Sequence, residues 1–133
     1  MKICKTYCGV LLLCFTMTSC DPEFYHDFYI ENQCKDDIEI NLYYSKRYAF
    51  PSSGRPDITN FLIKPHNNEL IASESTIRVY DDIHYYFDSI VIKKNDEISR
   101  VDYLDYSRWG SKNKHKHHTI SYLTVYPEDF EDE

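Results

Sequence analysis

The most constraining feature of the sequence is a segment in which apolar and polar side chains alternate, from Ile38 to Ser45. One side of this segment carries Ile38, Ile40, Leu42 and Tyr44, and the other carries Glu39, Asn41 and Tyr43. A period of two residues is typical of a β-strand with one buried face, because successive side chains point to opposite faces of a sheet. The segment therefore predicts a strand and names part of its core face.

Other parts of the chain have the composition and boundaries of short strands. They are residues 27–32, 58–64, 69–73, 75–80, 87–94, 98–104 and 119–126, with a hairpin expected between 58–64 and 69–73. Residues 105–109 predict one helical turn, residues 45–56 a long loop and residues 111–118 a polar, basic loop. Both faces of 119–126 carry apolar side chains, which predicts a central position in its sheet.

The composition also favours strands over helices. The chain has 13 tyrosines and 7 phenylalanines but only 3 glycines. Aromatic and β-branched residues are favoured in strands, and the chain offers no helical crossovers for a parallel sheet. We therefore predict an all-β fold, an antiparallel Ig-like β-sandwich of about seven to eight short strands.

The start of the chain has the features of an export signal. Lys2 and Lys5 precede an apolar run from Val10 to Phe15, and small residues lead from this run to Cys20. A basic start, a short apolar run and small residues are typical of a secretory signal peptide. The apolar run is too short to span a bilayer, which takes about 20 apolar residues.

The segment Met17-Thr18-Ser19-Cys20 resembles the bacterial lipobox. The resemblance implies that residues 1–19 are a lipoprotein signal peptide and that Cys20 is acylated and begins the mature chain. Several acyl chains on one residue give stable anchoring, whereas a single chain is marginal. Residues 20–26 are then an acidic tether, which resembles the surface-export signal of Bacteroidetes lipoproteins, and residues 27–133 form the β-sandwich domain.

The charge of the expected mature chain argues against nucleic acid as a partner. Two of the 15 Lys and Arg residues lie in residues 1–19, which leaves 13 basic against 22 acidic residues and a net charge of −9. Affinity for nucleic acid depends on basic groups that neutralise phosphates. The same acidity repels an anionic lipid surface, so attachment to the bilayer is expected to come from the lipid on Cys20.

Cys34 is the cysteine expected to stay free in the mature domain. Cys4, Cys8 and Cys14 leave with the signal peptide and Cys20 carries lipid, so no internal disulfide is expected. We expect Cys34 to be a small, half-buried apolar side chain. If Cys20 is not lipidated, a Cys20–Cys34 disulfide is the alternative.

The histidines of Lys114-His115-Lys116-His117-His118 are the candidate metal ligands. Imidazole is a common ligand of Zn²⁺ and Cu²⁺, and His115 and His117 would share one face of an extended strand. The lysines between them repel a cation, however, and no further ligand is evident. We therefore expect no metal or other cofactor, and a solvated basic loop is the alternative for His115, His117 and His118.

Trp109, Tyr103 and Tyr106 are the candidates for an aromatic binding surface, because Trp and Tyr dominate the energetics of interfaces. A position in the core is the alternative for Trp109. Acidic pairs such as Asp36-Asp37 and Asp81-Asp82 fall in expected turns. The sequence lacks a glycine-rich phosphate loop and a Gly-x-Ser-x-Gly elbow, so we expect a protein without catalytic activity.

The chain as a whole resembles the small β-sandwich lipoproteins of Bacteroidetes. The resemblance is carried by the lipobox, by Leu42-Tyr43-Tyr44-Ser45, by residues 87–92 and by Tyr122-Leu123-Thr124-Val125 with Pro127-Glu128-Asp129-Phe130. It implies a lipid-anchored protein of the outer membrane that faces the cell surface or else the periplasm. It implies no activity and transfers no functional residues.

We therefore expect a non-catalytic interaction module of the cell envelope, held in the lipid bilayer through Cys20, whose partner is an envelope protein or a glycan. The alternatives are an immunity or inhibitor-type lipoprotein and a small secreted hydrolase.

Overall fold

The computed structural model describes residues 23–45, 57–76 and 82–130. The predicted signal peptide, the lipidation site Cys20 and most of the predicted loop 45–56 lie outside the described residues. Among the described residues no helix is long and apolar enough to cross a membrane.

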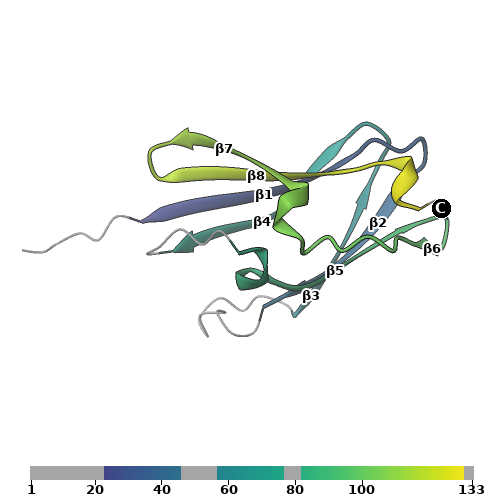
Figure 1. Ribbon diagram of the computed structural model, residues 1–133, viewed down its shortest axis with the longest axis horizontal. Coiled ribbons are helices and arrows are strands. Elements are labelled where there is room, and N and C mark those ends of the chain that lie inside the picture. The colour runs from purple at the N-terminus through teal and green to yellow at the C-terminus, as the bar shows by residue number, and fades with distance from the viewer. Residues whose placement is uncertain (1–22, 46–56, 77–81, 131–133) are drawn as a thin grey trace, which may run out of the picture.

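The described residues form eight strands and three 3₁₀ helices (Figure 1). The strands are β1 (Phe24–Asn32), β2 (Ile38–Tyr44), β3 (Ile58–Ile63), β4 (Asn68–Thr76), β5 (Phe87–Lys94), β6 (Glu97–Ile98), β7 (Trp109–His115) and β8 (His118–Val125). The 3₁₀ helices are η1 (Ile83–Tyr85), η2 (Tyr106–Arg108) and η3 (Pro127–Asp129).

Two four-stranded sheets pack against each other. The strand order is β4-β1-β8-β7 in the first, called sheet A here, and β3-β2-β5-β6 in the second, sheet B. The predicted all-β sandwich is therefore confirmed, as are the helical turn at η2 and the central position of β8. In Figure 1 the strands of sheet B are inclined to those of sheet A.

One pair of neighbouring strands departs from the predicted antiparallel arrangement. β1 and β8 run parallel, with Tyr29 beside Tyr122. Parallel neighbours need a long connection between them. Here most of the chain makes that connection, because it passes through sheet B before it returns as β8. The lack of helical crossovers therefore did not exclude a parallel pair between the first and last strands.

The predicted hairpin between residues 58–64 and 69–73 is wrong. β3 pairs with β2 in sheet B, whereas β4 pairs with β1 in sheet A, so the turn between β3 and β4 carries the chain from one sheet to the other. At this turn His66 has a φ of 60°, a left-handed conformation that is uncommon outside glycine. The residues of this short loop are typical of a turn, but the two strands that it connects belong to different sheets.

A buried asparagine explains why the chain changes sheets here. Asn32 is fully buried, and its side-chain Nδ2 donates to the carbonyl oxygens of Ile63 at 2.9 Å and Asp36 at 2.8 Å. Its Oδ1 accepts a hydrogen bond from the backbone N–H of Cys34 at 2.8 Å. Asn32 therefore ties the end of β1 in sheet A to the end of β3 in sheet B.

Several predicted boundaries also change. β1 begins at Phe24, so residues 24–26 of the predicted tether belong to the sheet, where they pair with the far end of β4. The predicted strands 69–73 and 75–80 are one strand as far as Thr76, and residues 77–81 lie outside the described residues. The predicted strand 98–104 is reduced to β6, and most of the predicted basic loop 111–118 is strand β7.

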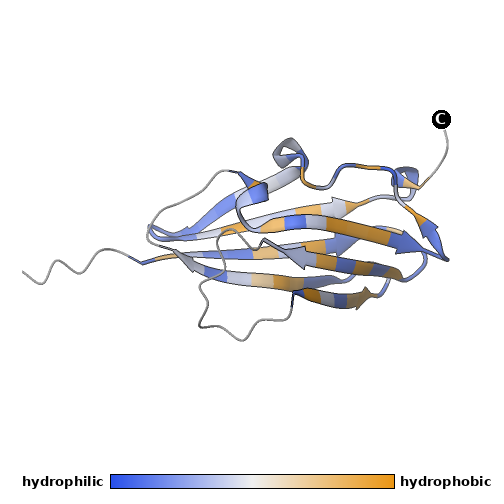
Figure 2. Ribbon diagram, turned by 90° about the horizontal axis from the view of Figure 1, so that it is seen from below, coloured by the Kyte–Doolittle hydropathy of each residue, from blue (hydrophilic) through white to orange (hydrophobic). Residues whose placement is uncertain are grey.

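The core lies between the inner faces of the two sheets. Ile38, Ile40 and Leu42 are fully buried, which confirms the predicted core face of β2. Phe28 of sheet A contacts Phe87 of sheet B, with ring centroids 5.1 Å apart. Figure 2 shows the resulting alternation of hydrophobic and hydrophilic residues along the strands. Cys34 is also in the core, as a free thiol, and burial raises its pKa.

Candidate functional site

The predicted aromatic surface is not formed, because two of its members belong to the core. Trp109 and Tyr103 are only 6% and 2% exposed. The indole N–H of Trp109 donates to the Tyr103 carbonyl at 2.8 Å, and its ring packs edge-on against Phe28 at 5.9 Å between centroids. Tyr106 is partly buried against the same core. These side chains supply buried apolar area rather than a binding surface.

Tyr103 is further fixed by polar contacts beneath the C-terminal segment. Its hydroxyl lies 2.7 Å from Ser99 Oγ and 3.5 Å from a carboxylate oxygen of Asp129. Asp129 in turn forms a 2.9 Å ion pair with Arg108 and accepts the Tyr126 backbone N–H at 3.0 Å. Burial raises the pKa of Tyr103, so its hydroxyl stays protonated in this structural cluster.

The three candidate metal ligands lie around the turn between β7 and β8 but do not converge. The rings of His115 and His118 are 6.4 Å apart between centroids, and the His117 ring instead packs edge-on against Phe24 at 4.9 Å. His118 Nε2 lies 2.7 Å from a carboxylate oxygen of Asp27. In the part of the chain that the structure describes, no three His, Cys, Asp or Glu side chains are grouped to hold a metal ion.

Asp27 also brings a serine and a histidine together on the outer face of sheet A. Its carboxylate accepts the Ser73 hydroxyl at 2.6 Å and faces His118 at 2.7 Å. Partial burial raises the pKa of Asp27, but these two hydrogen bonds, together with the charges of His118 and Lys114, outweigh that effect and hold the pKa below its usual value. In a hydrolytic triad the histidine stands between the hydroxyl and the carboxylate. Here the carboxylate stands between the two, so His118 and Ser73 are each bonded to Asp27 and do not form the Ser-His-Asp order of a triad.

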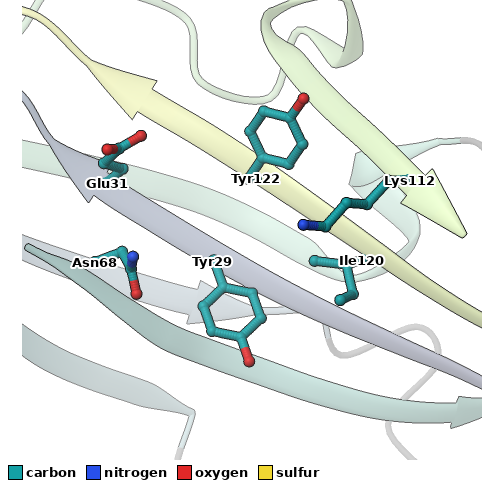
Figure 3. Close-up of a pocket in the computed structure, with 6 residues that line it drawn as sticks. All are labelled: Tyr29, Glu31, Asn68, Lys112, Ile120 and Tyr122. Atoms are coloured by element: carbon teal, nitrogen blue, oxygen red, sulfur yellow. The ribbon is translucent and has the colours of Figure 1, made fainter. Parts of the chain in front are cut away.

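A hollow on the same outer face is the strongest candidate for a binding site (Figure 3). Its volume is about 430 Å³, and it is called the tyrosine hollow here. The lining residues are Tyr29, Glu31, Asn68, Lys112, Ile120 and Tyr122. Small-molecule sites commonly have volumes of about 300–1,000 Å³ and combine apolar side chains with a few polar groups. The tyrosine hollow has both properties.

The strand register brings these residues together from all four strands of sheet A. Tyr29 on β1 lies beside Tyr122 on β8, and Glu31 lies opposite Asn68 on β4. Ile120 lies opposite Lys112 on β7. The side chains project from the solvent-facing side, because the residues between them along β1 and β8 point into the core.

The two tyrosines form opposite walls of the hollow. In Figure 3 the Tyr122 ring points towards β7, whereas the Tyr29 ring points towards β4. Tyr122 lies against the backbone of Gly110, where an added Cβ atom would collide with its ring. The lack of a side chain at Gly110 therefore allows the Tyr122 ring to pack directly on the backbone of the edge strand. Tyr122 remains 42% exposed and is available to a ligand.

A β-bulge in β4 sets the register that places Asn68, the β4 residue of the hollow, opposite Glu31. The register between β1 and β4 shifts after Phe28, so that Tyr29 lies opposite Leu70. Ile71 and Ala72 are both buried as a result, and the Ile71 carbonyl accepts the Tyr44 hydroxyl of sheet B at 2.9 Å. The bulge thus turns Leu70 outward beside Tyr29, because the extra residue re-aims the side chains that flank it.

The polar groups of the hollow differ in charge and in how firmly other residues hold them in place. Glu31 is held in place, because one carboxylate oxygen accepts Gln33 Nε2 at 2.6 Å and the other lies 3.5 Å from Thr124 Oγ1. Lys112 stands on the edge strand and is exposed. Asn68 adds an amide that can both donate and accept. The hollow therefore offers an anion, a cation and a neutral amide around two aromatic rings.

Sequence reasoning missed the hollow, although one signal pointed to it. The apolar residues on both faces of 119–126 predicted a central strand, and β8 is central in sheet A. The second apolar face, with Ile120 and Tyr122, lines the hollow and is not covered by another sheet of the described residues. The partners on β7 and β4 were hidden, because their segments were predicted as a loop and as half of a hairpin.

Comparisons with protein-family models, curated proteins and solved structures found no match to the chain. The resemblance to small Bacteroidetes lipoproteins therefore stays a prediction.

Proposed function

We propose that the protein is a non-catalytic, lipid-anchored binding module of the cell envelope and that its tyrosine hollow binds a glycan. The observation that carries this proposal is the pairing of two tyrosine rings with three polar side chains in one open hollow on sheet A. A sugar ring has the matching chemistry, because its C–H groups form apolar faces and its hydroxyls point outward as donors and acceptors. The tyrosine rings can pack against the apolar C–H faces of the sugar. Glu31 and Asn68 can form hydrogen bonds with its hydroxyls.

The size of the hollow favours a glycan over a protein partner. A stable protein interface takes about 800 Å² from each partner and is centred on a desolvated apolar core. The tyrosine hollow is instead lined by two charged residues, Glu31 and Lys112, and its volume of about 430 Å³ lies in the range of small-molecule sites. A space of this kind suits one or a few sugar rings.

The number of carboxylates in the hollow favours binding of a glycan over its hydrolysis. Glycoside hydrolases commonly use two carboxyl groups that flank the scissile bond. Among the described residues, six line the tyrosine hollow, and Glu31 is the single acid of these six. The nearby Asp27 is already engaged by Ser73 and His118. A ligand in the hollow would therefore be held without a second carboxylate to cleave it.

The proposed anchor is compatible with access to the hollow. β1 begins at Phe24, four positions after Cys20, at the end of sheet A where β7 turns into β8 (Figure 1). Tyr29 lies five positions further along β1, and a strand rises about 3.3 Å per residue, so the hollow begins about 17 Å beyond the start of the strand. A domain anchored at Cys20 would carry the hollow on its side, away from the bilayer.

Binding to an array of neutral and acidic oligosaccharides tests the proposed ligand class. We expect the detergent-solubilised protein to bind at least one group of oligosaccharides, and Tyr122→Ala or Tyr29→Ala to weaken this binding about tenfold or more. Tyr43→Ala, on the outer face of sheet B and 36% exposed, is the matched control that should leave binding unchanged. Equal loss in all three variants, or no binding at all, would contradict the proposal.

A glycine variant sharpens this test. Gly110→Ala keeps every side chain of the hollow but forces the Tyr122 ring out of its place. We expect it to weaken glycan binding as Tyr122→Ala does. Unchanged binding in Gly110→Ala would show that the position of the Tyr122 ring is irrelevant to recognition.

The anchor has its own test. The intact mass of the protein extracted from native membranes should equal residues 20–133 plus acyl chains. Loss of this mass when intact cells are treated with protease would place the protein on the cell surface, and protection would place it towards the periplasm. A mass without acyl chains would reject Cys20 as the lipidation site.

A further inference from the structure

We infer that the glycan bound by the tyrosine hollow is anionic and that Lys112 pairs with a carboxylate on one of its sugar rings. This inference rests on the proposed function and adds the chemical class of the ligand. The observation behind it is that basic residues are concentrated in one part of sheet A, although the chain as a whole is acidic.

The segment that forms β7 and β8 is basic, although the whole chain has a net charge of −7. Residues 106–127 contain Arg108, Lys112, Lys114 and Lys116 and no Asp or Glu. Arg108 is neutralised by its ion pair with Asp129. Lys112 lines the tyrosine hollow, whereas Lys114 and Lys116 lie further along β7 and in the turn after it, where Lys114 interacts electrostatically with Asp27. An anion near this edge therefore meets an attractive local charge.

Lys112 is the basic residue that reaches the hollow itself. In Figure 3 its side chain runs from β7 towards β8, and its ammonium group lies near Tyr122 and Ile120. Within the described residues no carboxylate lies at ion-pair distance from this ammonium group. The acid of the hollow, Glu31, stands on β1 beside the opposite edge of the sheet and is already bonded to Gln33. Among the described residues, Lys112 is thus a cation that lines an aromatic site without a carboxylate at ion-pair distance.

The positions of Lys112 and Glu31 predict how an anionic ligand is oriented in the hollow. A carboxylate near Lys112 gains a charge-assisted hydrogen bond, whereas one near Glu31 is repelled. The hydroxyls of the same sugar would face Glu31 and Asn68, which accept and donate at the β1 and β4 side of the hollow. The apolar surfaces of Tyr29 and Tyr122 require a ring as well as a charge. A uronic acid meets all three conditions, whereas a small inorganic anion meets one.

Matched pairs of oligosaccharides test the inference. Each pair consists of a uronic-acid oligosaccharide and its carboxyl-reduced counterpart, which differ only in the charged group. We expect calorimetry to show about tenfold tighter binding of the acidic member of at least one pair. Raising the salt from about 0.05 M to about 0.5 M should weaken the acidic member and leave the neutral member unchanged, because salt screens exposed charges.

A charge-removing variant assigns the effect to one side chain. Lys112→Gln should remove most of the preference for the acidic member and leave the affinity for the neutral member unchanged. Lys35→Gln, an exposed lysine in the loop after β1, is the control that should change neither. Thermal unfolding of both variants should match the wild type, because neither lysine is buried.

The outcomes separate the inference from the proposed function. Equal binding of both members of every pair, with loss in Tyr122→Ala, would overturn the anionic ligand and keep the glycan. A preference for the acidic member that survives in Lys112→Gln would overturn the role of Lys112. Failure of every oligosaccharide to bind would overturn the inference and the proposed function together.

Discussion

Sheets A and B share one core but use their outer faces differently. The outer face of sheet A ties polar side chains together across strands, as in the contacts of Asp27 with Ser73 on β4 and His118 on β8. On the outer face of sheet B, the apolar side chains of Leu62 and Ile58 on edge strand β3 are 64% and 48% exposed. Burial of the inner faces therefore explains the fold, whereas the ordered outer side chains of sheet A mark the face on which we propose that a ligand binds.

The largest expected effect lies on the inner faces, where the two sheets are alike. Phe28→Ala should lower the free energy of unfolding by about 3–5 kcal/mol, because the ring is fully buried and contacts aromatic rings of both sheets. Ile40→Ala in sheet B should cost about 2–5 kcal/mol for the same reason. Urea titration measures both values. A loss below about 1 kcal/mol in either variant would contradict the shared core.

The next effect concerns the residue that joins the sheets. Asn32→Ala removes hydrogen bonds to Ile63, Asp36 and Cys34 and leaves buried backbone groups without partners. We expect a loss of about 1–3 kcal/mol in urea unfolding. Asn41→Ala, on the outer face of sheet B, is the matched control and should stay within about 0.5 kcal/mol of the wild type. Similar losses in both variants would contradict the tie through Asn32.

A smaller and pH-dependent effect belongs to the outer face of sheet A. The pKa of Asp27 is lowered in the folded chain, so the ionised carboxylate stabilises the fold above its unfolded pKa of about 3.9. This stabilisation is lost as the pH falls through the lower folded value. Asp27→Asn should therefore be less stable than the wild type at pH 7, and the difference in urea unfolding should shrink below about pH 4. Asp37→Asn, at an exposed loop position, is the control, and a difference that does not change with pH would contradict the role of the Asp27 charge.

The smallest effects on stability are expected for the exposed side chains. Leu62→Ser should change the free energy of unfolding by no more than about 0.5 kcal/mol, and Tyr122→Ala, which also loses its packing on Gly110, by no more than about 1 kcal/mol. They should differ in function, because only Tyr122 lines the tyrosine hollow. Loss of glycan binding in Leu62→Ser but not in Tyr122→Ala would place the binding face on sheet B.

The regular strands could be predicted from the sequence because their signals are local. β2 shows strict alternation, and β5 was predicted with the bounds that the structure gives, Phe87–Lys94. The sheet assignment of β3 and β4 could not be predicted, because it depends on Asn32, which lies far from their turn in sequence. The parallel pairing of β1 with β8 is also a long-range contact that no local pattern records.

The site was harder to predict than the fold. The aromatic residues that stand out in the sequence, Trp109 and Tyr103, are used in the core. The tyrosines of the hollow look like ordinary members of alternating strands, and only the pairing of β1 with β8 places Tyr29 beside Tyr122. Lys112 belongs to a segment that looked like a basic loop, because its polar residues occupy an exposed edge strand.

The most direct test of the binding face is an NMR titration of the protein with a uronic-acid oligosaccharide that binds it. We predict that amide shifts concentrate on Tyr29, Glu31, Lys112 and Tyr122 and their neighbours in sheet A. Shifts centred on Asn41, Asn60 and Val91, which occupy the outer face of sheet B, would contradict it.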